Sequence, residues 1–361
     1  MGKIFLKIRS LLKRKIFFKG CLFFSRYSYK QFPFILKLFN FCLYQLGDSI
    51  YYESYKKRYL LSGCISKIKL LEIKKEKINN IGNSHEINLA IEKLKTIGIY
   101  ENLDIKISKD SRNDFVNYIN RSNFYDSHVI SDKPSKCSDE NVTGAYKSYD
   151  YNTQLNNPTL LNLCLNPKLL KIAELYLGCM PNIDSINTFI TLPKKLSFTH
   201  EFHRDLNNIK QLVVFIYWTK TSFDNGSFEY IRHTHKPSNF LQNLLMNEKS
   251  IFKDNCESFF QNTTPGYGNC DNYQKIFKSE IVSTFGDECK IVACDPFGLH
   301  RGTPVKSPRM VTWIRFGNSI SRQKMVSAEE TKFKKASLND ECREIFLKSK
   351  FRFLLNDFVN Y

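Results

Sequence analysis

Long uncharged hydrophobic segments and clustered cysteines are both missing from this sequence, and each absence excludes a class of protein. The longest charge-free run near the N-terminus is Leu38–Gly47, about half of the roughly 20 apolar residues that a transmembrane helix needs. The eleven cysteines are scattered without a CxxC pair, which argues against a zinc ribbon or a disulfide scaffold. No small-residue cleavage site follows the N-terminal apolar residues, so a signal peptide is not expected. We therefore expect a cytoplasmic protein with reduced thiols and no membrane span.

Acidic residues are scarce at the N-terminus. Residues 1–70 contain 15 lysines and arginines but only Asp48 and Glu53, which gives this segment a net charge of +13 out of +19. The rest of the chain carries a net charge of only +6, so a nucleic-acid-binding fold over the whole length is not indicated. No nucleic-acid partner is expected.

The basic N-terminal extension, residues 1–70, is also rich in Phe and Leu. Ile4, Ile8 and Leu11 fall at helical spacing. This pattern fits either a basic amphipathic helix on an anionic membrane surface or a helical extension packed on the main body. The aromatic pattern that continues from Phe24 to Leu61 favours packing, with weak peripheral membrane contact as a secondary property.

The spacing of apolar residues divides the remaining chain into two parts. The main domain, residues 71–320, begins with helical periodicity at Ile87–Ile97 and Pro167–Gly178. From about residue 180 the period changes to two, which predicts an α+β fold with an antiparallel β core supported by helices. Residues 321–361 are expected to form a C-terminal helical segment, over Glu329–Val359. The expected strands are Ser185–Leu192, Gln211–Thr219, Ser227–Ile231, Ile281–Phe285, Lys290–Cys294 and Met310–Phe316.

Two histidines and one aspartate in this β region form a candidate metal site. His203 and Asp205 are two residues apart just before an expected strand, and residues at i and i+2 of an extended segment point to the same face. His300 follows another expected strand. Two histidines and one carboxylate form the facial triad of non-haem Fe(II) oxygenases, which leaves three coordination positions open.

Arg309 is the candidate for binding a co-substrate. It lies nine residues after His300, at the start of an expected strand. An arginine inside a barrel mouth is costly unless it is paired, and its planar guanidinium suits two-point binding of a carboxylate. A dicarboxylate that chelates iron at one end and pairs with Arg309 at the other fits this arrangement. Arg315, on the same strand, is the alternative partner.

The sequence from about Asn88 to Gly317 resembles the phytanoyl-CoA dioxygenase-like branch of the Fe(II)/2-oxoglutarate-dependent oxygenases. The resemblance is strongest in three segments that occur in the family's order: FHRDLNNIKQLVVFIYWT, DNGSFEYIRHTHK and FGLHRGTPVKSPRMVTWIRF. It implies a double-stranded β-helix, a jelly-roll or cupin-like barrel, flanked by helices.

The resemblance also implies residue roles. His203, Asp205 and His300 would be the iron ligands, and Arg309 would bind the distal carboxylate of 2-oxoglutarate. Trp218 occupies a position where some members place a residue against the co-substrate, although a tryptophan on a strand can equally belong to the core.

The implied activity is that of a dioxygenase. It would use O2 and 2-oxoglutarate to hydroxylate a small-molecule or lipid-like substrate, releasing succinate and CO2, with ascorbate in a supporting role. The intact Asp205 favours hydroxylation, because halogenating relatives lack this carboxylate. The alternative is a non-catalytic jelly-roll binding protein attached peripherally to membranes.

One segment departs from the family pattern. Ile231-Arg232-His233-Thr234-His235 stands where members often show a Pro-Gly-Ser-His turn. His235 matches the histidine of that turn, and His233 is additional. We expect these two histidines to form a structural turn or the edge of a substrate pocket rather than a second metal site.

Overall fold

The computed structural model describes residues 60–63, 65–66, 84–126, 142, 144–193, 198–205, 208–241, 243, 270–318 and 334–360. The expectations for residues 1–59 therefore lie outside the described residues. In the described part, no helix is long and apolar enough to cross a membrane.

The N-terminal half of the main domain is helical, and local sequence signals explain where its helices begin. An Asn, Asp or Ser side chain accepts a hydrogen bond from the first turn of each helix, which satisfies backbone donors that have no intrahelical partner. The helix predicted after residue 166 ends at Gly178, whose φ of +77° closes it in the left-handed conformation. These helices are α4 (His85–Thr96), α5 (Lys109–Arg121), α6 (Tyr151–Leu155), α7 (Pro158–Cys164) and α8 (Pro167–Leu177).

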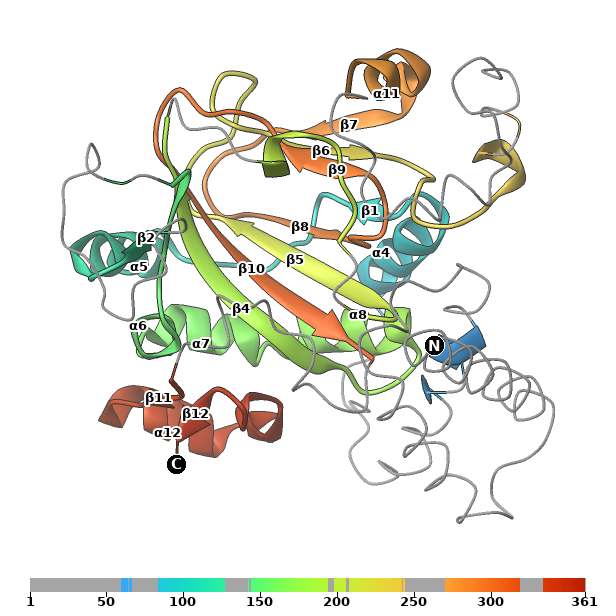
Figure 1. Ribbon diagram of the computed structural model, residues 1–361. Helices are drawn as coiled ribbons and strands as arrows, with labels where there is room; N and C mark the ends of the chain where they lie inside the picture. Colours follow the sequence, from blue (N-terminus) through green and yellow to red (C-terminus); the bar gives the residue numbers. More distant parts are fainter. Residues whose placement is uncertain are drawn as a thin grey trace, which may run out of the picture.

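The larger of the two main sheets is antiparallel, and its strand order is β1-β8-β5-β10-β4-β3-β2 (Figure 1). Its long strands coincide with four of the predicted ones. A short sheet of order β7-β6-β9 lies opposite. The strands of the large sheet are β1 (Ile99–Tyr100), β2 (Tyr125–Asp126), β3 (Tyr146–Ser148), β4 (Asn182–Thr191), β5 (Gln211–Tyr217), β8 (Lys290–Cys294) and β10 (Arg309–Gly317). Those of the short sheet are β6 (Phe228–Ile231), β7 (Ile281–Thr284) and β9 (His300–Gly302).

The strand order is that of a double-stranded β-helix. From β4 onward the chain passes back and forth between the two sheets: β5, β8 and β10 join the large sheet, whereas β6, β7 and β9 join the small one. A backbone bridge between His203 and His300 adds the segment between β4 and β5 to the small sheet. This alternation closes the two sheets into a jelly-roll barrel, so the predicted fold class is confirmed.

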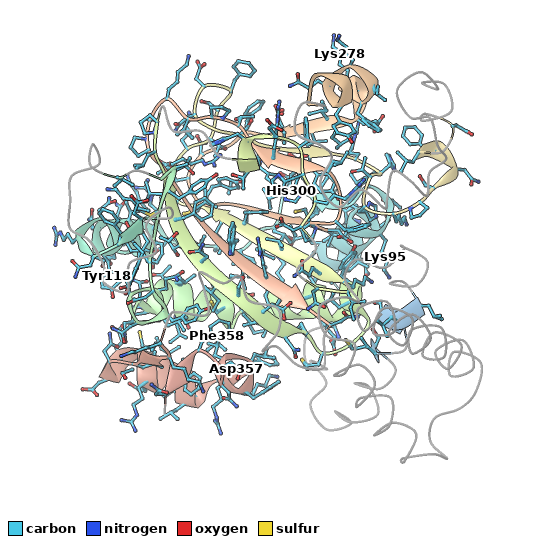
Figure 2. All side chains as sticks on the ribbon, in the orientation of Figure 1. Lys95, Tyr118, Lys278, His300, Asp357 and Phe358 are labelled. Atoms are coloured by element: carbon cyan, nitrogen blue, oxygen red, sulfur yellow. The ribbon has the colours of Figure 1, made fainter. Side chains whose placement is uncertain are left out.

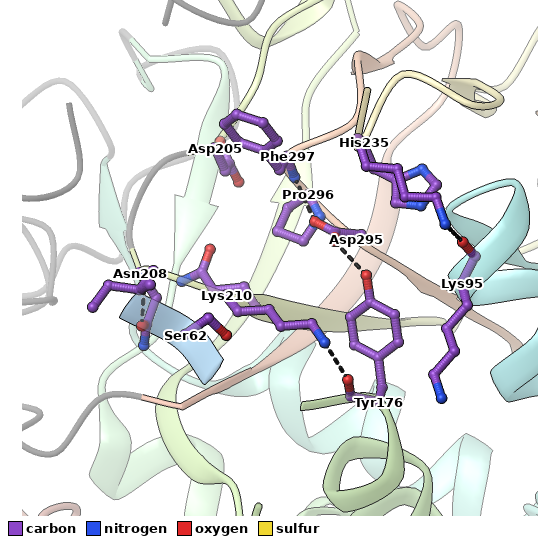
Figure 3. Close-up of a pocket in the computed structure, with 13 residues that line it drawn as sticks. Ser62, Lys95, Tyr176, Asp205, Asn208, Lys210, His235, Asp295, Pro296 and Phe297 are labelled. Atoms are coloured by element: carbon purple, nitrogen blue, oxygen red, sulfur yellow. Dashed lines mark hydrogen bonds between the residues drawn. The ribbon is translucent and has the colours of Figure 1, made fainter. Parts of the chain in front are cut away.

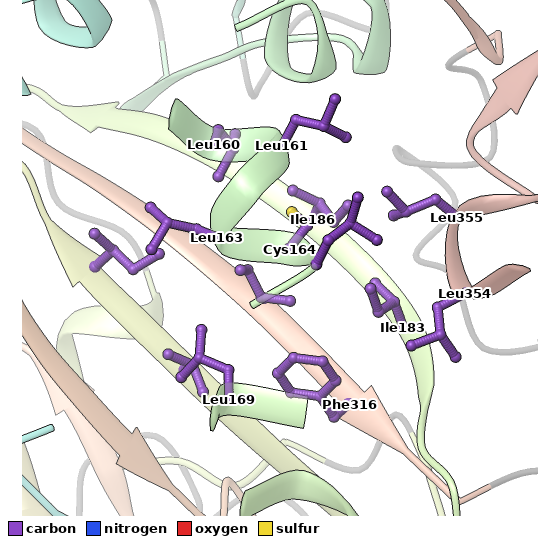
Figure 4. Packing of buried hydrophobic residues seen from close by; sticks show 14 of the residues in the cluster. Leu160, Leu161, Leu163, Cys164, Leu169, Ile183, Ile186, Phe316, Leu354 and Leu355 are labelled. Carbon is purple, nitrogen blue, oxygen red and sulfur yellow. The ribbon is translucent and has the colours of Figure 1, made fainter. Parts of the chain in front are cut away.

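The large sheet is buried on both faces. Leu212, Val214 and Ile216 of β5 belong to the main core together with residues of α7 and α8, and Figure 4 shows leucines of these helices packed against the sheet. The alternate residues Val213 and Phe215 pack toward the small sheet. The barrel interior therefore lies between the sheets, away from the helices.

The C-terminal segment, expected to be helical over Glu329–Val359, is helical in only part of its described residues. In the described residues the α-helix α12 covers only Asp340–Lys348, and the chain then turns through η7 (Arg352–Leu355). The turn buries Phe358, whose ring meets Tyr151 edge-on at 4.9 Å. Burial of this ring against α6 outweighs the helical tendency of the local sequence. The remaining described elements are β11 (Ala336–Ser337), β12 (Val359–Asn360), α11 (Cys270–Ile276), η4 (Phe198–His200) and η5 (Lys278–Glu280).

Candidate metal centre

Backbone hydrogen bonds bring the two predicted metal-binding segments together. The amide of His203 donates to the carbonyl of His300 at 2.9 Å, and the amide of His300 donates back at 3.0 Å. The amide of Asp205 donates to the carbonyl of Pro296 at 2.9 Å. Residues far apart in the sequence are thereby fixed side by side between the sheets, where Figure 2 labels His300.

The three side chains converge on one point. His203 Nε2 lies 3.8 Å from Asp205 Oδ1, and His300 Nε2 lies 3.9 Å from Asp205 Oδ2. One ligand atom of each residue lies within 4.8 Å of the others. A single ion at about 2.0–2.2 Å from each atom, a usual range for imidazole and carboxylate ligands, fits between them.

Hydrogen bonds on the far side of each imidazole set its tautomer. His203 Nδ1 lies 2.8 Å from the carbonyl of Glu201, and His300 Nδ1 lies 2.9 Å from the carbonyl of Gly298. Because a carbonyl can only accept, each Nδ1 carries the hydrogen and Nε2 keeps its lone pair. Such bonds orient metal-binding histidines.

The electrostatics favour the metal-binding protonation states of His300 and Asp205. Burial, and then the neighbouring His203, lower the pKa of His300 to about 4. Burial raises the pKa of Asp205, but Arg315, His300 and His203 outweigh it, so the net shift is downward. Two neutral imidazoles and one ionised carboxylate are the donor set of non-haem Fe(II) sites. The residues present therefore fit iron.

Arg315 is paired with the carboxylate of the triad. Its Nη2 donates to Asp205 Oδ2 at 2.9 Å, and its guanidinium lies 4.4 Å from the centre of the Trp313 ring. The sequence named Arg315 only as an alternative to Arg309. In the structure Arg315 instead binds the second carboxylate oxygen of Asp205.

Arg309 is buried without an acidic partner among the described residues. Nη1 donates to the carbonyl of Gly226, and Nη2 donates to Thr191 Oγ1 at 3.2 Å, while Nε has no partner in the described part of the chain. A buried cation lacking a counter-charge is costly. A carboxylate supplied by a ligand would satisfy it, as the resemblance predicts.

Two glycines make room for the Arg309 side chain. A Cβ on Gly226 would meet Arg309 Nη1 at 2.7 Å, and one on Gly302 would meet Nη2 at 3.2 Å. Gly302 is two residues after His300 on β9, which places the guanidinium roughly 7 Å along the strand from the distal histidine. The five-carbon chain of 2-oxoglutarate spans a distance of this order, so the residues fit this co-substrate as well.

The structure does not bring Trp218 to the triad. Its indole is fully buried, packs 4.0 Å from the centre of the Phe115 ring, and donates to Thr312 Oγ1 at 2.8 Å. Trp218 directly follows Tyr217 of β5, and successive residues of a strand face opposite sides. The side chain of Tyr217 faces the barrel interior, so that of Trp218 faces the helices and belongs to the main core. The structure therefore does not place Trp218 against the co-substrate, as the resemblance had implied.

This placement makes a prediction for Trp218→Ala. We expect the free energy of unfolding to fall by about 3–5 kcal/mol, the usual cost of deleting a fully buried large aromatic side chain. The apparent KM for 2-oxoglutarate should stay unchanged in the fraction that remains folded. Urea denaturation and turnover assays measure the two effects, and a raised KM with unchanged stability would contradict the core assignment.

The turn after β6 contains His233 and His235. His233 adopts a positive φ of 66° and its amide donates to the carbonyl of Ile97 at 3.0 Å. His235 is buried and lines a cavity beside Asp205. His233 therefore lies in a structural turn, and His235 lies at the edge of a pocket, which are the two placements expected from the sequence.

Comparison with known proteins gives structural likeness only. No family model matches the chain, and no curated protein matches it. Among solved structures it is similar to HygX from Streptomyces hygroscopicus with nickel and 2-oxoglutarate bound, at 13% identity and a TM-score of 0.43, over 72% of this chain and 94% of that one. It is also similar to EctD from S. alaskensis with 2-oxoglutarate and 5-hydroxyectoine, at 12% identity and a TM-score of 0.42, over 68% and 79%.

A third similar structure is that of SnoK, a non-heme alpha ketoglutarate dependent carbocyclase from nogalamycin biosynthesis. The identity is 12% and the TM-score 0.40, over 67% of this chain and 85% of that one. Structures described as those of non-heme alpha ketoglutarate dependent enzymes are thus among the structural neighbours. Because the TM-scores are below 0.5, the function assigned below rests on the strand order and the triad.

Proposed function

We propose that this chain is an Fe(II)- and 2-oxoglutarate-dependent dioxygenase that hydroxylates a small-molecule or lipid-like substrate. The observation that carries the proposal is the convergence of His203, Asp205 and His300 between the sheets of a double-stranded β-helix. A buried Arg309 with no acidic partner among the described residues supports it.

The triad side chains would hold the metal through two imidazole nitrogens and one carboxylate oxygen. The carbonyls of Glu201 and Gly298 keep each Nδ1 protonated and the rings fixed in orientation. Arg315 restrains the other oxygen of Asp205, which favours binding through one oxygen and leaves coordination positions open for 2-oxoglutarate and O2. When bound, iron and 2-oxoglutarate supply the oxidation of a C–H bond, with succinate and CO2 as co-products.

The barrel interior would orient the co-substrate and exclude water. Arg309 would bind the distal carboxylate with its planar guanidinium, which Thr191 and the Gly226 carbonyl hold in place. Phe215 and Phe228 are buried on the interior side, with ring centres 4.9 Å apart. A dry, apolar interior strengthens the interaction between Arg309 and a carboxylate.

Turnover of 2-oxoglutarate tests the proposal. Purified protein with Fe(II), ascorbate, O2 and 2-oxoglutarate should form succinate, and mass spectrometry of soluble metabolites added to the reaction should show one that gains one oxygen atom. If 2-oxoglutarate is bound but never converted, the alternative of a non-catalytic jelly-roll binding protein is correct.

Weak peripheral membrane contact through residues 1–70 is a further proposal, and it rests on their net charge of +13. Each accessible Lys or Arg near an anionic bilayer contributes on the order of 1 kcal/mol. We expect the full chain to sediment with anionic vesicles at low salt and to be released at high salt, because salt screens the attraction. Equal sedimentation with neutral vesicles would contradict this electrostatic attachment.

A further inference from the structure

A cavity of about 250 Å³ opens beside the triad at Asp205. Figure 3 shows that its walls come from distant parts of the chain: Tyr176 from α8, Lys95 from α4, Lys210 before β5 and Asp295 after β8. Asp205 belongs both to this cavity and to the triad. A molecule in the cavity would therefore lie next to the metal position.

Two buried polar side chains in the cavity wall keep unsatisfied hydrogen-bonding atoms among the described residues. Both the oxygen and the nitrogen of the Gln211 side-chain amide are unpaired, and the His235 ring has only the Lys95 backbone beside it as a partner. The two residues are only 3% and 4% exposed. Leaving such groups unsatisfied is costly, so a ligand that supplies partners would bind here with a gain in free energy. An apolar ligand would leave the cost unchanged.

Three lysines give the cavity a surplus of positive charge. Lys95, Lys210 and Lys236 line it, and no carboxylate lies within ion-pair distance of their ammonium groups in the described ranges. Lys210 Nζ donates to the Tyr176 carbonyl and lies 4.5 Å from the centre of the Tyr176 ring. Burial lowers the pKa of Lys210, and the charges of Lys95 and Lys236 add to this lowering.

The two acids of the cavity do not cancel this surplus. Asp205 is paired with Arg315 and would be a metal ligand. Asp295 accepts a hydrogen bond from the Tyr176 hydroxyl and, at 2.9 Å, another from the amide of Phe297. It raises the pKa of Lys210 less than burial lowers it. The cavity thus offers cations and hydrogen-bonding groups to a negatively charged ligand.

We propose that this cavity binds an oxyanion of the prime substrate, a carboxylate or a phosphate, with Lys210 as its main cation and Gln211 and His235 as hydrogen-bonding partners. The inference rests on the proposed function, and it narrows the substrate from small-molecule or lipid-like compounds to anionic, polar ones. Hydroxylation would then occur on a carbon near the anionic group, because Asp205 borders the cavity.

Binding of two small anions tests the proposal without knowledge of the substrate. Full-length protein loaded with redox-inert Zn(II) and saturating 2-oxoglutarate is titrated with acetate and with methyl phosphate, and saturation-transfer NMR follows their methyl groups. At least one anion should bind saturably, and the tighter of the two identifies the carboxylate or the phosphate. Lys210→Gln should raise its Kd at least fivefold, whereas Lys210→Arg should retain binding.

A matched control and a second variant separate binding from folding. Lys278→Gln makes the same charge change on exposed η5, which Figure 2 places at the edge of the molecule by α11, and it should leave the Kd unchanged. Gln211→Met should weaken binding while the melting temperature stays equal or rises, because the native amide has no partner to lose. A merely structural Gln211 would instead show a lower melting temperature.

The outcomes are distinct from those that test the proposed function. No saturable binding of either anion, or equal Kd values in the Lys210, Gln211 and Lys278 variants, overturns the oxyanion site. Calorimetry measures the binding of Zn(II) and of 2-oxoglutarate separately. If the unsubstituted protein bound neither, the proposed function would be overturned instead. The anion titration is repeated on metal-free protein, because none of Lys210, Gln211 and His235 belongs to the triad.

Discussion

His300→Ala is expected to lose Fe(II) binding and succinate formation together. The substitution removes one of only three protein ligands. Loss of a group that merely hydrogen-bonds a ligating histidine typically costs about 10–100-fold in metal affinity or activity, so loss of the ligand itself should cost more than about 100-fold. Anaerobic Fe(II) titration and a succinate assay measure both effects, and His203→Ala should behave in the same way.

His233→Ala is the matched control for these variants. His233 lies on the turn after β6, with Nε2 at 3.8 Å from Glu280, and takes no part in the triad. The His233→Ala variant should bind one Fe(II) per chain with the affinity of the unsubstituted protein. Full turnover by both His300→Ala and His203→Ala would eliminate the metal site assigned to the triad.

Arg309→Lys is expected to raise the apparent KM for 2-oxoglutarate by on the order of 10- to 100-fold while iron binding persists. Lysine keeps the charge but loses the planar two-point contact, and charge-assisted hydrogen bonds of this kind contribute about 1.5–3 kcal/mol. Steady-state kinetics at varied 2-oxoglutarate and a parallel Fe(II) titration separate the two effects.

Arg315→Lys provides the comparison within the same strand. Because Arg315 pairs with Asp205, its substitution should weaken iron binding and leave the KM for 2-oxoglutarate nearly unchanged. The opposite pattern, with the KM raised by Arg315→Lys and not by Arg309→Lys, would show that Arg315 holds the distal carboxylate.

The strands and the triad could be predicted because their signals are local. Short runs rich in β-branched and aromatic residues, bounded by turn residues, mark β4, β5, β8 and β10, and the spacing of His203 and Asp205 places both on one face of an extended segment. His300 could be added because a facial triad requires a second imidazole. The backbone bridge between His203 and His300 supplies the proximity that the sequence could only imply.

The side of the sheet on which Trp218 lies could not be read from the sequence. The run QLVVFIYW is apolar at almost every position, because β5 is buried on both faces, and a strand of this kind has no polar alternation to mark its interior side. Side-chain partners far apart in the sequence were also missed. Arg315 and Asp205 are separated by 110 residues, and the oxyanion cavity needs several distant segments to form.

The most direct test of the account is an anaerobic crystal structure of the full chain with Mn(II), an inert substitute for Fe(II), and 2-oxoglutarate. It should show one metal ion bound by His203 Nε2, His300 Nε2 and an oxygen of Asp205, with the distal carboxylate of 2-oxoglutarate on the Arg309 guanidinium. A metal ion elsewhere, or 2-oxoglutarate that makes no contact with Arg309, would contradict the account.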